Sequence, residues 1–281
     1  LLTEADTALR NAQLEGRNNT YFLVHGDQAN PVSALIQQAG EWQATLQHAI
    51  ANEEILFHYQ PIYSLPDRKI LAQEIFVRLE RNDEVVNAGV FMPMAERFGL
   101  LEDLDRLIIA RALDQLSSDS PVFVINLSTR SLQEESFNLW LMNRLHEHRE
   151  HANKIIFELQ EYSIHLAYDA VKNLIDSATE WGYRFSVDHF GSGATNFAYL
   201  QSLDLHFIKF DRNFIAGLQN NRDNQFFIQS VAQIAKSRDM ELIAEGVEEP
   251  EELQALVDLG VDAAMGYLLG RPGASLADAS E

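Results

Sequence analysis

Cysteine is absent from the 281 residues of this sequence. This absence excludes disulfide bonds, thiolate nucleophiles and cysteine-ligated zinc sites. A chain without disulfides suits a reducing compartment, and we therefore expect a cytoplasmic location.

Basic residues are scarce relative to acidic ones. The chain has 21 Lys and Arg against 42 Asp and Glu, which gives a formal net charge of −21. Such a surface repels long polyanions, so the composition argues against duplex nucleic acid as a partner. A small dianionic ligand can still bind where a local arginine, lysine or metal ion reverses the field.

Long hydrophobic runs are also missing. No stretch approaches the roughly 20 apolar residues of a membrane-spanning helix, and the first residues do not resemble a signal peptide. With 46 % hydrophobic and 22 % charged residues, the composition is that of a folded globular protein. Because the chain begins at Leu1 without a methionine, we expect a soluble piece of a longer protein that makes no membrane contact itself.

Short apolar runs alternate with amphipathic stretches from Glu54 onward. The amphipathic stretches, at 132–147, 164–181, 220–237 and 250–259, have helical spacing. This alternation predicts an α/β fold in which βα units close into a barrel, with an open doubly wound sheet as the alternative. The eight runs expected to form strands are ILFHYQPIYS (55–64), KILAQEIFVRL (69–79), VFVINLS (122–128), KIIFELQE (154–161), RFSVDHFG (184–191), FIKFD (207–211), ELIAEGVE (241–248) and AAMGYLLG (263–270).

Two helical segments are predicted before this region. Residues 1–23 begin with a helical pattern that ends near Gly16 and continue into a short strand, which is too little chain for a domain. A second helix is predicted between Asn30 and Asn52, with Pro31 and Ser33 marking its start. We expect this second helix to act as a connector.

The strand candidates are apolar until their C-terminal ends, where six of them present a polar group. In a barrel these ends share one rim, so residues far apart in the sequence converge there. Carboxylates and an amide oxygen form the environment that Mg²⁺, Mn²⁺ or Ca²⁺ prefers. Alternatively, each acid only caps the following helix. The six polar groups are Glu74, Asn126, Glu158, Asp188, Lys209 and Glu245.

One strand end carries two adjacent candidate ligands. The stretch 184–197 reads RFSVDHFGSGATNF, in which the strand ends at Asp188 and His189 and a glycine-containing loop follows. A carboxylate at the end of a strand, before such a loop, can hold a metal ion or an anionic ligand.

A series of short motifs resembles the successive signatures of the EAL domain family. The motifs are QPI (60–62), QEIFVR (73–78), FMPMAERFGLLEDLD (91–105), NLS (126–128), ELQE (158–161), DHFGSG (188–193), IKFD (208–211), AEGVE (244–248) and MGYLLGRP (265–272). They follow the family order across residues 41–273. The resemblance implies an α/β fold, a modified TIM (β/α)8 barrel, that binds or hydrolyses cyclic di-GMP.

The resemblance also implies a division of the chain into segments. Residues 4–18, EADTALRNAQLEGRN, resemble the last helix of a GGDEF domain, which commonly precedes an EAL domain. The implied segments are a C-terminal GGDEF remnant at 1–23, a linker helix at 24–45, the EAL domain at 46–276 and a tail at 277–281.

Metal-binding and catalytic roles follow from the same resemblance. Lys209 would orient or deprotonate the attacking water, Glu245 would support the metal and water network, and Glu161 would brace the glycine loop. With Glu74, the residues Lys209 and Glu245 form the implied catalytic set. The implied first metal site consists of Glu74, Asn126, Glu158 and Asp188.

Ligand contacts are implied as well. Arg78 would meet a phosphate of the ligand, a task suited to its planar donors, and Gln60 would line the nucleotide groove. The full set implied to contact the ligand is Gln60, Glu74, Ile75, Phe76, Arg78, Asp105, Asn126, Asp188, Phe190, Lys209, Glu245 and Met265.

Four residues in three motifs depart from the family pattern. Ile75 and Phe76 follow the glutamate that names the family, His189 replaces a second aspartate, and Met265 replaces a glutamine. Replacing a hard anionic ligand by an imidazole weakens a Mg²⁺ site in particular. Losses beside the reacting centre, with Gln60 and Arg78 retained, predict a domain that binds the dinucleotide without efficient hydrolysis and requires no cofactor for binding.

The expected function is therefore a cyclic di-GMP receptor, most similar to the inactive EAL domain of LapD-type GGDEF-EAL receptors, in the cytoplasmic part of an inner-membrane protein. Imidazole can ligate Mn²⁺, so the first alternative is an active or weakly active phosphodiesterase that uses Mg²⁺ or Mn²⁺ and produces pGpG. The second alternative is a scaffold that does not bind the nucleotide. Expected partners are a second copy of the chain, paired through the EAL domain, and a downstream protein.

Overall fold

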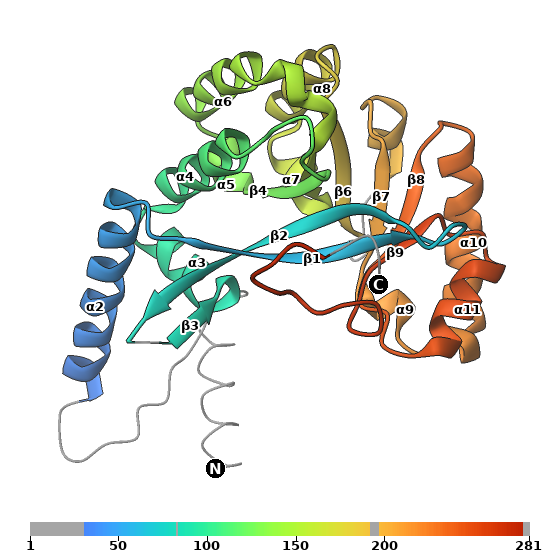
Figure 1. Ribbon diagram of the computed structural model, residues 1–281, viewed down its shortest axis with the longest axis horizontal. Coiled ribbons are helices and arrows are strands. Elements are labelled where there is room, and N and C mark those ends of the chain that lie inside the picture. Colours follow the sequence, from blue (N-terminus) through green and yellow to red (C-terminus); the bar gives the residue numbers. More distant parts are fainter. Residues whose placement is uncertain (1–30, 83, 192–196, 278–281) are drawn as a thin grey trace.

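The computed structural model describes residues 31–82, 84–191 and 197–277, and in this part of the chain eight strands form a closed barrel. Its strands follow one another in the order β1, β2, β4, β5, β6, β7, β8 and β9, and β9 pairs with β1 to close the ring (Figure 1). The barrel prediction is confirmed, and the open doubly wound sheet is wrong. The strands are Leu56–Ser64 (β1), Ile70–Arg81 (β2), Phe123–Leu127 (β4), Ile155–Gln160 (β5), Arg184–Phe190 (β6), Phe207–Phe210 (β7), Glu241–Ala244 (β8) and Ala263–Ala264 (β9).

Strand β1 runs antiparallel to both of its neighbours in the ring, whereas the other pairs in the ring are parallel. The cause is the short connection between β1 and β2, residues 65–69, which forms a hairpin turn. A parallel pair needs a crossover of a dozen or more residues, and this connection is too short for one. A further strand, β3 (Glu84–Asn87), extends β2 as a second hairpin outside the ring.

Helices cover the outside of the barrel, as Figure 1 shows for α4, α6, α8, α10 and α11. Their apolar faces pack on the outward-facing side chains of the strands, which gives one contiguous core. The helices are Ala88–Arg97 (α3), Leu101–Asp114 (α4), Thr129–Leu132 (α5), Glu135–Glu147 (α6), Glu161–Leu166 (α7), Tyr168–Thr179 (α8), Arg212–Ile215 (α9), Arg222–Lys236 (α10) and Pro250–Asp258 (α11). Short 3₁₀ segments lie at Arg149–Lys154, Phe197–Gln201 and Leu218–Asn220.

Helix α2 (Pro31–Ala51) precedes the barrel and is continuous through residue 45. Its C-terminal half is attached to the barrel: Leu46 is fully buried, and Arg81 of β2 lies 4.2 Å from the centroid of the Trp42 ring. The expected GGDEF remnant at 1–23 lies outside the described residues, and the boundary at 45/46 stays a prediction. Among the described helices, none combines the length and the apolar character needed to cross a membrane.

The barrel interior contains an apolar layer, followed along the strands by a polar layer. The apolar layer consists of Ile62, Ala72, Val124, Ile156, Phe207, Ile243, Ala263 and Met265. Because alternate residues of a strand face the same side, the residue two positions after an apolar one also points inward. The pairs Ala72/Glu74, Val124/Asn126, Ile156/Glu158, Phe207/Lys209 and Ile243/Glu245 follow this rule. The polar rim therefore arises from one repeated spacing.

The C-terminal segment returns across the β1–β2 hairpin. The amide side chain of Gln73 donates to the carbonyl of Ala277 and accepts from its N–H, each at 3.0 Å. Gln60 Nε2 donates to the Gly270 carbonyl at 2.8 Å. Residue 277, the first of the expected tail, is thus hydrogen-bonded to the barrel.

Candidate functional site

Lys209, on β7, lies at the centre of the polar rim and is 1 % exposed. Its Nζ is 2.7 Å from Glu74 Oε2 and 2.9 Å from Glu158 Oε2. Asp188 Oδ1 and Glu245 Oε2 lie farther from the same nitrogen, at 3.7 and 4.0 Å. Four carboxylates thus converge on one ammonium group, as the sequence pattern predicted. The predicted position at a strand end is wrong for Glu74, because β2 continues past the rim to Arg81.

The charge states of this group follow from burial and from the neighbouring charges. Burial lowers the pKa of Lys209, but the carboxylates of Asp188, Glu158 and Glu74 outweigh it and hold the pKa well above its usual value. Burial raises the pKa of Glu158, and the Lys209 ammonium only partly counteracts this effect. Lys209 is therefore a permanent cation within the rim.

Asn126 completes the expected first metal set. Its side chain is exposed at the end of β4, and Nδ2 donates to Glu74 Oε1 at 3.1 Å. Glu158 Oε1 accepts a hydrogen bond from Ser186 Oγ at 3.3 Å. Three carboxylates and one amide are ligands that suit a hard divalent cation, so the donor chemistry fits the expected metal. In this structure Lys209 supplies the positive charge between Glu74 and Glu158.

His189 lies beside this set because β6 is irregular at its end. Adjacent residues of a regular strand point to opposite faces. Here His189 has a left-handed backbone, with φ of 53°, and the pairing between β6 and β7 shifts register between Val187 and Phe190. The imidazole consequently lies on the rim, with Nδ1 2.8 Å from Asp211 Oδ2 and Nε2 3.3 Å from Asp188 Oδ2.

Asp188, His189 and Glu245 form a possible metal-ligand group. One ligand atom from each lies within 4.8 Å of the other two. Burial lowers the pKa of His189, but Asp188, Asp211 and Glu245 outweigh it and raise the pKa above its usual value. Burial also raises the pKa of Glu245.

Glu161, the first residue of α7, has the contacts that its expected bracing role requires. Its Oε2 accepts from the N–H of Gly191 at 3.1 Å, and its Oε1 accepts from the Tyr199 hydroxyl at 3.0 Å. These two residues flank the segment 192–196, which lies outside the described residues. A buried carboxylate thus connects both ends of the glycine loop.

An arginine-lined cavity of about 650 Å³ opens beside the rim. Arg78, 9 % exposed, points into it from β2 and donates from Nη1 to the Val77 carbonyl at 3.0 Å. Arg212 and Arg271 line the same cavity and are exposed. Three arginines thus line one cavity in a chain of net charge −21, together with Glu245 and with Glu248, whose Oε1 lies 2.8 Å from Arg212 Nη2. We call this space the arginine cavity; its expected ligand contacts are Gln60, Phe76, Arg78, Glu245 and Met265.

A second cavity of about 680 Å³ lies on the other side of Phe76, and we call it the Asp105 cavity. Asp105 is 4 % exposed, and its Oδ2 accepts hydrogen bonds from the hydroxyls of Ser128 and Ser131. Burial raises the pKa of Asp105 to about 6 although both hydroxyls counteract it. The expected ligand contacts in this cavity are Ile75, Phe76, Asp105 and Asn126.

Phe190 departs from its expected role. The prediction placed it among the ligand contacts, but its side chain is fully buried. Its ring stacks on Phe197 with centroids 4.7 Å apart and lies 6.1 Å from Phe210. Phe190 is therefore a core residue in this structure, because β6 directs it outward from the barrel toward the helices. Met265 is 1 % exposed and borders the arginine cavity as apolar bulk.

Sequence reasoning did not assign a role to Asp211, the last residue of the IKFD motif. Its Oδ1 accepts from the N–H of Asn213 at the start of α9, and its Oδ2 contacts His189. The signal available in the sequence was its position two residues after Lys209. Arg212, Tyr267 and Arg271 were also missed as lining residues of the arginine cavity. Arg212 begins the short helix α9, and Tyr267 and Arg271 lie outside helices and strands, so no periodic pattern marks these positions.

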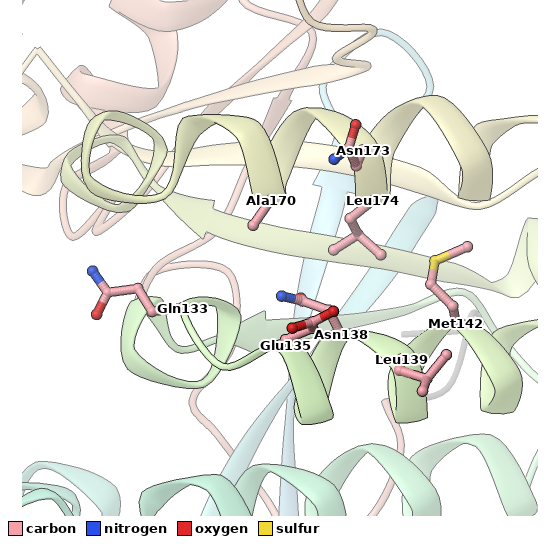
Figure 2. A pocket seen from close by; sticks show the side chains of 8 residues that line it. All are labelled: Gln133, Glu135, Asn138, Leu139, Met142, Ala170, Asn173 and Leu174. Atoms are coloured by element: carbon pink, nitrogen blue, oxygen red, sulfur yellow. The ribbon is translucent and has the colours of Figure 1, made fainter.

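A third cavity, of about 440 Å³, lies away from the rim between α6 and α8 (Figure 2). Its walls carry amides and apolar groups such as Asn138, Asn173 and Leu139. The titratable side chain among its lining residues is Glu135, which is exposed. The reactive groups described above belong to the barrel rim and not to this outer groove.

Comparison with known proteins connects this geometry to characterised relatives. The chain is 26 % identical over 280 residues to the Pseudomonas aeruginosa bifunctional diguanylate cyclase/cyclic di-GMP phosphodiesterase MucR, covering 97 % of this chain and 40 % of that protein. It is 27 % identical over 279 residues to the Shewanella oneidensis cyclic di-GMP phosphodiesterase PdeB, covering 97 % and 32 %. The chain thus spans two fifths or less of the length of these two relatives.

Solved structures agree with the fold. The Pseudomonas aeruginosa FimX EAL domain bound to c-di-GMP superposes with a TM-score of 0.77 at 25 % identity, covering 84 % of this chain and 98 % of that one. The apo S helix-GGDEF-EAL fragment of Vibrio cholerae LapD gives 0.78 at 22 % identity, covering 95 % and 64 %, which shows likeness of fold alone. The EAL domain family model matches residues 43–272. The chain therefore belongs to the EAL domain family, whose members include cyclic di-GMP phosphodiesterases and cyclic di-GMP-binding domains.

Proposed function

We propose that this chain is a receptor for cyclic di-GMP that binds the dinucleotide without efficient hydrolysis. The observation that carries the proposal is the position of His189, whose imidazole lies between the carboxylates of Asp188 and Asp211. Residues expected to hold the nucleotide line two adjoining cavities.

The shape of the site supports a ligand with two similar halves. The arginine cavity and the Asp105 cavity share Phe76, Ala88 and Gly89 in their walls. Each has the size of a small-molecule pocket. An aromatic ring between two cavities suits a dinucleotide whose two purines lie on either side of it, because stacking on a ring tolerates either base. The structures of FimX and MucR from Pseudomonas aeruginosa contain this dinucleotide, which supports the choice of ligand.

Polar groups in the two cavities complement the parts of such a ligand. In the arginine cavity, Arg78 offers planar donors to a phosphate. In the Asp105 cavity, both serine hydroxyls bond to Oδ2 of Asp105. We infer that Oδ1 accepts from the N–H groups of a guanine. These contacts require no metal ion, so binding persists in a chelator.

Hydrolysis needs more than these contacts. When bound, a pair of divalent ions supplies an activated water and stabilises the leaving oxygen. The first set of ligands, around Glu74 and Glu158, is present, whereas His189 stands where the family pattern has a second aspartate. A neutral nitrogen ligand disfavours Mg²⁺ at that position. Lys209 remains an ammonium and serves to hold the carboxylates in place.

The test is a calorimetric titration with cyclic di-GMP in EDTA, followed by chromatography of the same sample after long incubation. We expect binding and intact nucleotide. Arg78→Ala should weaken binding by about 1.5–3 kcal/mol, as for a hydrogen bond to a charged group. Arg238→Ala, an exposed arginine beyond α10, is the matched control and should leave the affinity unchanged.

Undiminished affinity of Arg78→Ala would contradict the proposed pose. Absence of any binding heat would favour the scaffold alternative.

The second candidate function, a slow phosphodiesterase, is favoured by one observation, the complete first set of Glu74, Asn126, Glu158 and Asp188 around Lys209. Formation of pGpG with Mn²⁺ or Mg²⁺, absent in EDTA, would establish that function instead.

The bound state also has to change an interaction of the domain with a partner protein. We infer that nucleotide binding changes pairing of the EAL domain with a second copy or with a downstream protein, at the cytoplasmic face of the inner membrane. Light scattering with and without cyclic di-GMP measures the first of these directly. If cyclic di-GMP leaves the molar mass of the protein unchanged, the partner that responds to the bound state is the downstream protein.

A further inference from the structure

We propose that the groove between α6 and α8 is the docking site for a basic amphipathic helix of a partner protein. This groove is the cavity of about 440 Å³ shown in Figure 2, and we call it the α6–α8 groove. The inference names the surface and the chemistry of the downstream partner, and in that respect it rests on the receptor proposal. Docking of the helix itself does not require the nucleotide.

The α6–α8 groove has apolar walls on the outside of the barrel. Leu174 on α8 is 3 % exposed and lies at its base, whereas Leu139 on α6 is 66 % exposed at its edge. Met142 extends from α6 toward α8 in Figure 2. Apolar side chains of a partner gain free energy when they cover such a surface. The groove between two packed helices accepts the ridge of a third one, so an amphipathic helix has the shape that fits.

Asn138 adds an unsatisfied hydrogen-bond acceptor to this groove. Its Nδ2 donates to the Leu132 carbonyl at 2.8 Å, which fixes the amide group. Its Oδ1 is buried and has no hydrogen-bond partner among the described residues. Buried polar atoms are normally paired, and an unpaired one is unfavourable. Glu135 lies one helical turn before Asn138 and is exposed, so its side chain can move aside for a donor that enters with the partner.

The basic residues of the two helices are already paired with acids. Arg144, the arginine of α6, lies 2.5 Å from Asp114 and 2.9 Å from Glu147. Lys172, the lysine of α8, lies 2.8 Å from Asp176. These pairs leave no excess of positive charge beside the α6–α8 groove.

Two further carboxylates select a basic partner. Glu135 and Asp169 are exposed in the first turns of α6 and α8, and neither forms an ion pair within the part of the chain that the structure describes. The two helices follow the parallel strands β4 and β5, so these first turns lie at the same end of the groove. Lysine or arginine side chains at one end of a docked helix can reach both carboxylates. A second copy of this chain carries −21 itself, so charge disfavours it as the occupant.

Gln133 connects the α6–α8 groove to the proposed nucleotide site, because it lines both this groove and the Asp105 cavity. Tyr162 and Leu166 of α7, 65 % and 50 % exposed, also line the Asp105 cavity, and α8 follows α7 directly. A nucleotide in that cavity and a helix in the groove therefore share a wall. Any effect of the nucleotide on the affinity for the helix is matched by an equal effect of the helix on the affinity for the nucleotide.

The probe is a labelled synthetic peptide of about 18 leucine and lysine residues, with the leucines spaced to form one face of a helix. Its counterpart has glutamate in place of lysine. Fluorescence anisotropy measures the affinity of each peptide for the full chain in EDTA without nucleotide. We expect saturable binding of the leucine–lysine peptide, weakened by added salt, and at least about tenfold weaker binding of the leucine–glutamate peptide.

An apolar substitution tests the position of the docking site. Leu139→Asn should weaken binding of the leucine–lysine peptide at least about tenfold, because a leucine contact is lost without a change of charge. Phe226→Asn is the matched control, since that ring is 72 % exposed on α10, away from the groove. It should leave the affinity unchanged.

A charge reversal tests the choice of partner. The double substitution Glu135→Lys and Asp169→Lys should make the leucine–glutamate peptide the tighter ligand. Asp223→Lys, in the first turn of α10, is the control and should leave the order of the two peptides unchanged. Circular dichroism confirms the folding of each variant.

Unchanged affinity in Leu139→Asn, or an equal loss in Phe226→Asn, would overturn the docking site. Self-association of the chain that Leu139→Asn abolishes, measured by light scattering, would assign the groove to a second copy instead.

Saturating cyclic di-GMP should change the peptide affinity at least about fivefold, and Gln133→Ala should remove this effect. Equal peptide affinity with and without bound nucleotide would overturn the assignment of the groove to the downstream partner. Calorimetric titration with cyclic di-GMP tests the receptor proposal separately. Failure of that titration and failure of peptide binding are therefore distinguishable.

Discussion

Asp105 illustrates how a single residue can be held for a ligand at a cost to the free protein. The carboxyl group is buried between α4 and the β4–α5 connection, where two serine hydroxyls are its hydrogen-bond donors. Burial raises its pKa to about 6. Ionisation at neutral pH is therefore less favourable in the folded state than in the unfolded chain, whose aspartates have pKa values of about 3.9.

This pKa shift predicts a pH-dependent stability. An acid with a raised pKa contributes stability below its unfolded pKa, and that contribution is lost as the pH rises through the folded pKa. The unfolding free energy of Asp105→Asn minus that of wild type should therefore rise by about 2 kcal/mol between pH 4 and pH 7.5. Urea unfolding of both proteins at the two pH values measures the change. An equal difference at both values would show that Asp105 is not desolvated.

The rim residues could be predicted from sequence because they share one spacing. Glu74, Asn126 and Glu158 each stand two positions after an inward apolar residue, and a barrel brings such positions together. The contact between His189 and Asp211 could not be predicted. It depends on the left-handed backbone at His189 and on the register shift beside it, and neither feature has a local sequence pattern.

At the scale of elements, β6 connects the rim to the outer core. Asp188 points inward to Lys209, while Phe190 points outward into a group of rings with Phe197 and Phe210. Gly191 follows directly, and a Cβ at that position would lie 2.8 Å from the ring of Phe227. The glycine thus lets the strand end pass close to the aromatic group before the loop begins.

We expect Phe190→Ala to lower the unfolding free energy by about 3–5 kcal/mol, because it leaves a cavity within this group. Phe226→Ala is the matched control: its ring, on α10, is 72 % exposed, so the change should stay within about 0.5 kcal/mol. Urea unfolding measures both. Similar effects of the two substitutions would mean that Phe190 is not part of the core.

The positions of the helices and strands could largely be predicted from the sequence, whereas the direction of β1 could not. Each of the eight apolar runs coincides with a barrel strand, although β2 extends two residues beyond its run, to Arg81. The helical patterns at 220–237 and 250–259 match α10 and α11 to within two residues at each end. Strand β3 was missed because Glu84–Asn87 is short and mostly exposed, so it carries no apolar run. The reversed direction of β1 follows from a turn length rather than from hydrophobic periodicity.

For the whole molecule, β9 closes the barrel because it pairs with β8 on one side and with β1 on the other. Strand β9 has two residues, and the chain then passes Gly266. A Cβ at Gly266 would lie 2.2 Å from the backbone of Val247, so the two segments approach as closely as backbone atoms allow. Val247 also donates to the Met265 carbonyl and accepts from the N–H of Leu268, each at 3.1 Å.

Gly266→Ala should therefore destabilise the barrel by about 1–3 kcal/mol or more, because backbone must shift to admit the methyl group. Gly40→Ala is the control, since that glycine is exposed within α2 and a Cβ there has no atom within 4 Å. Because glycine in the middle of a helix is less favourable than alanine, Gly40→Ala should raise the unfolding free energy by about 0.5–1 kcal/mol. Thermal and urea unfolding measure both, and tolerance of alanine at 266 would contradict the close approach.

The arginine cavity has a consequence for how a ligand arrives. The chain as a whole carries −21, so a dianion meets repulsion while it is still distant. Arg78, Arg212 and Arg271 attract it only at short range, because Glu245 and Glu248 line the same cavity and Glu248 Oε1 lies 2.8 Å from Arg212 Nη2. At low ionic strength, where the Debye length is longest, the net charge therefore slows the encounter, whereas the arginines act on a ligand that has reached the cavity. Added salt screens the long-range repulsion first, so for this protein moderate ionic strength accelerates association instead of slowing it.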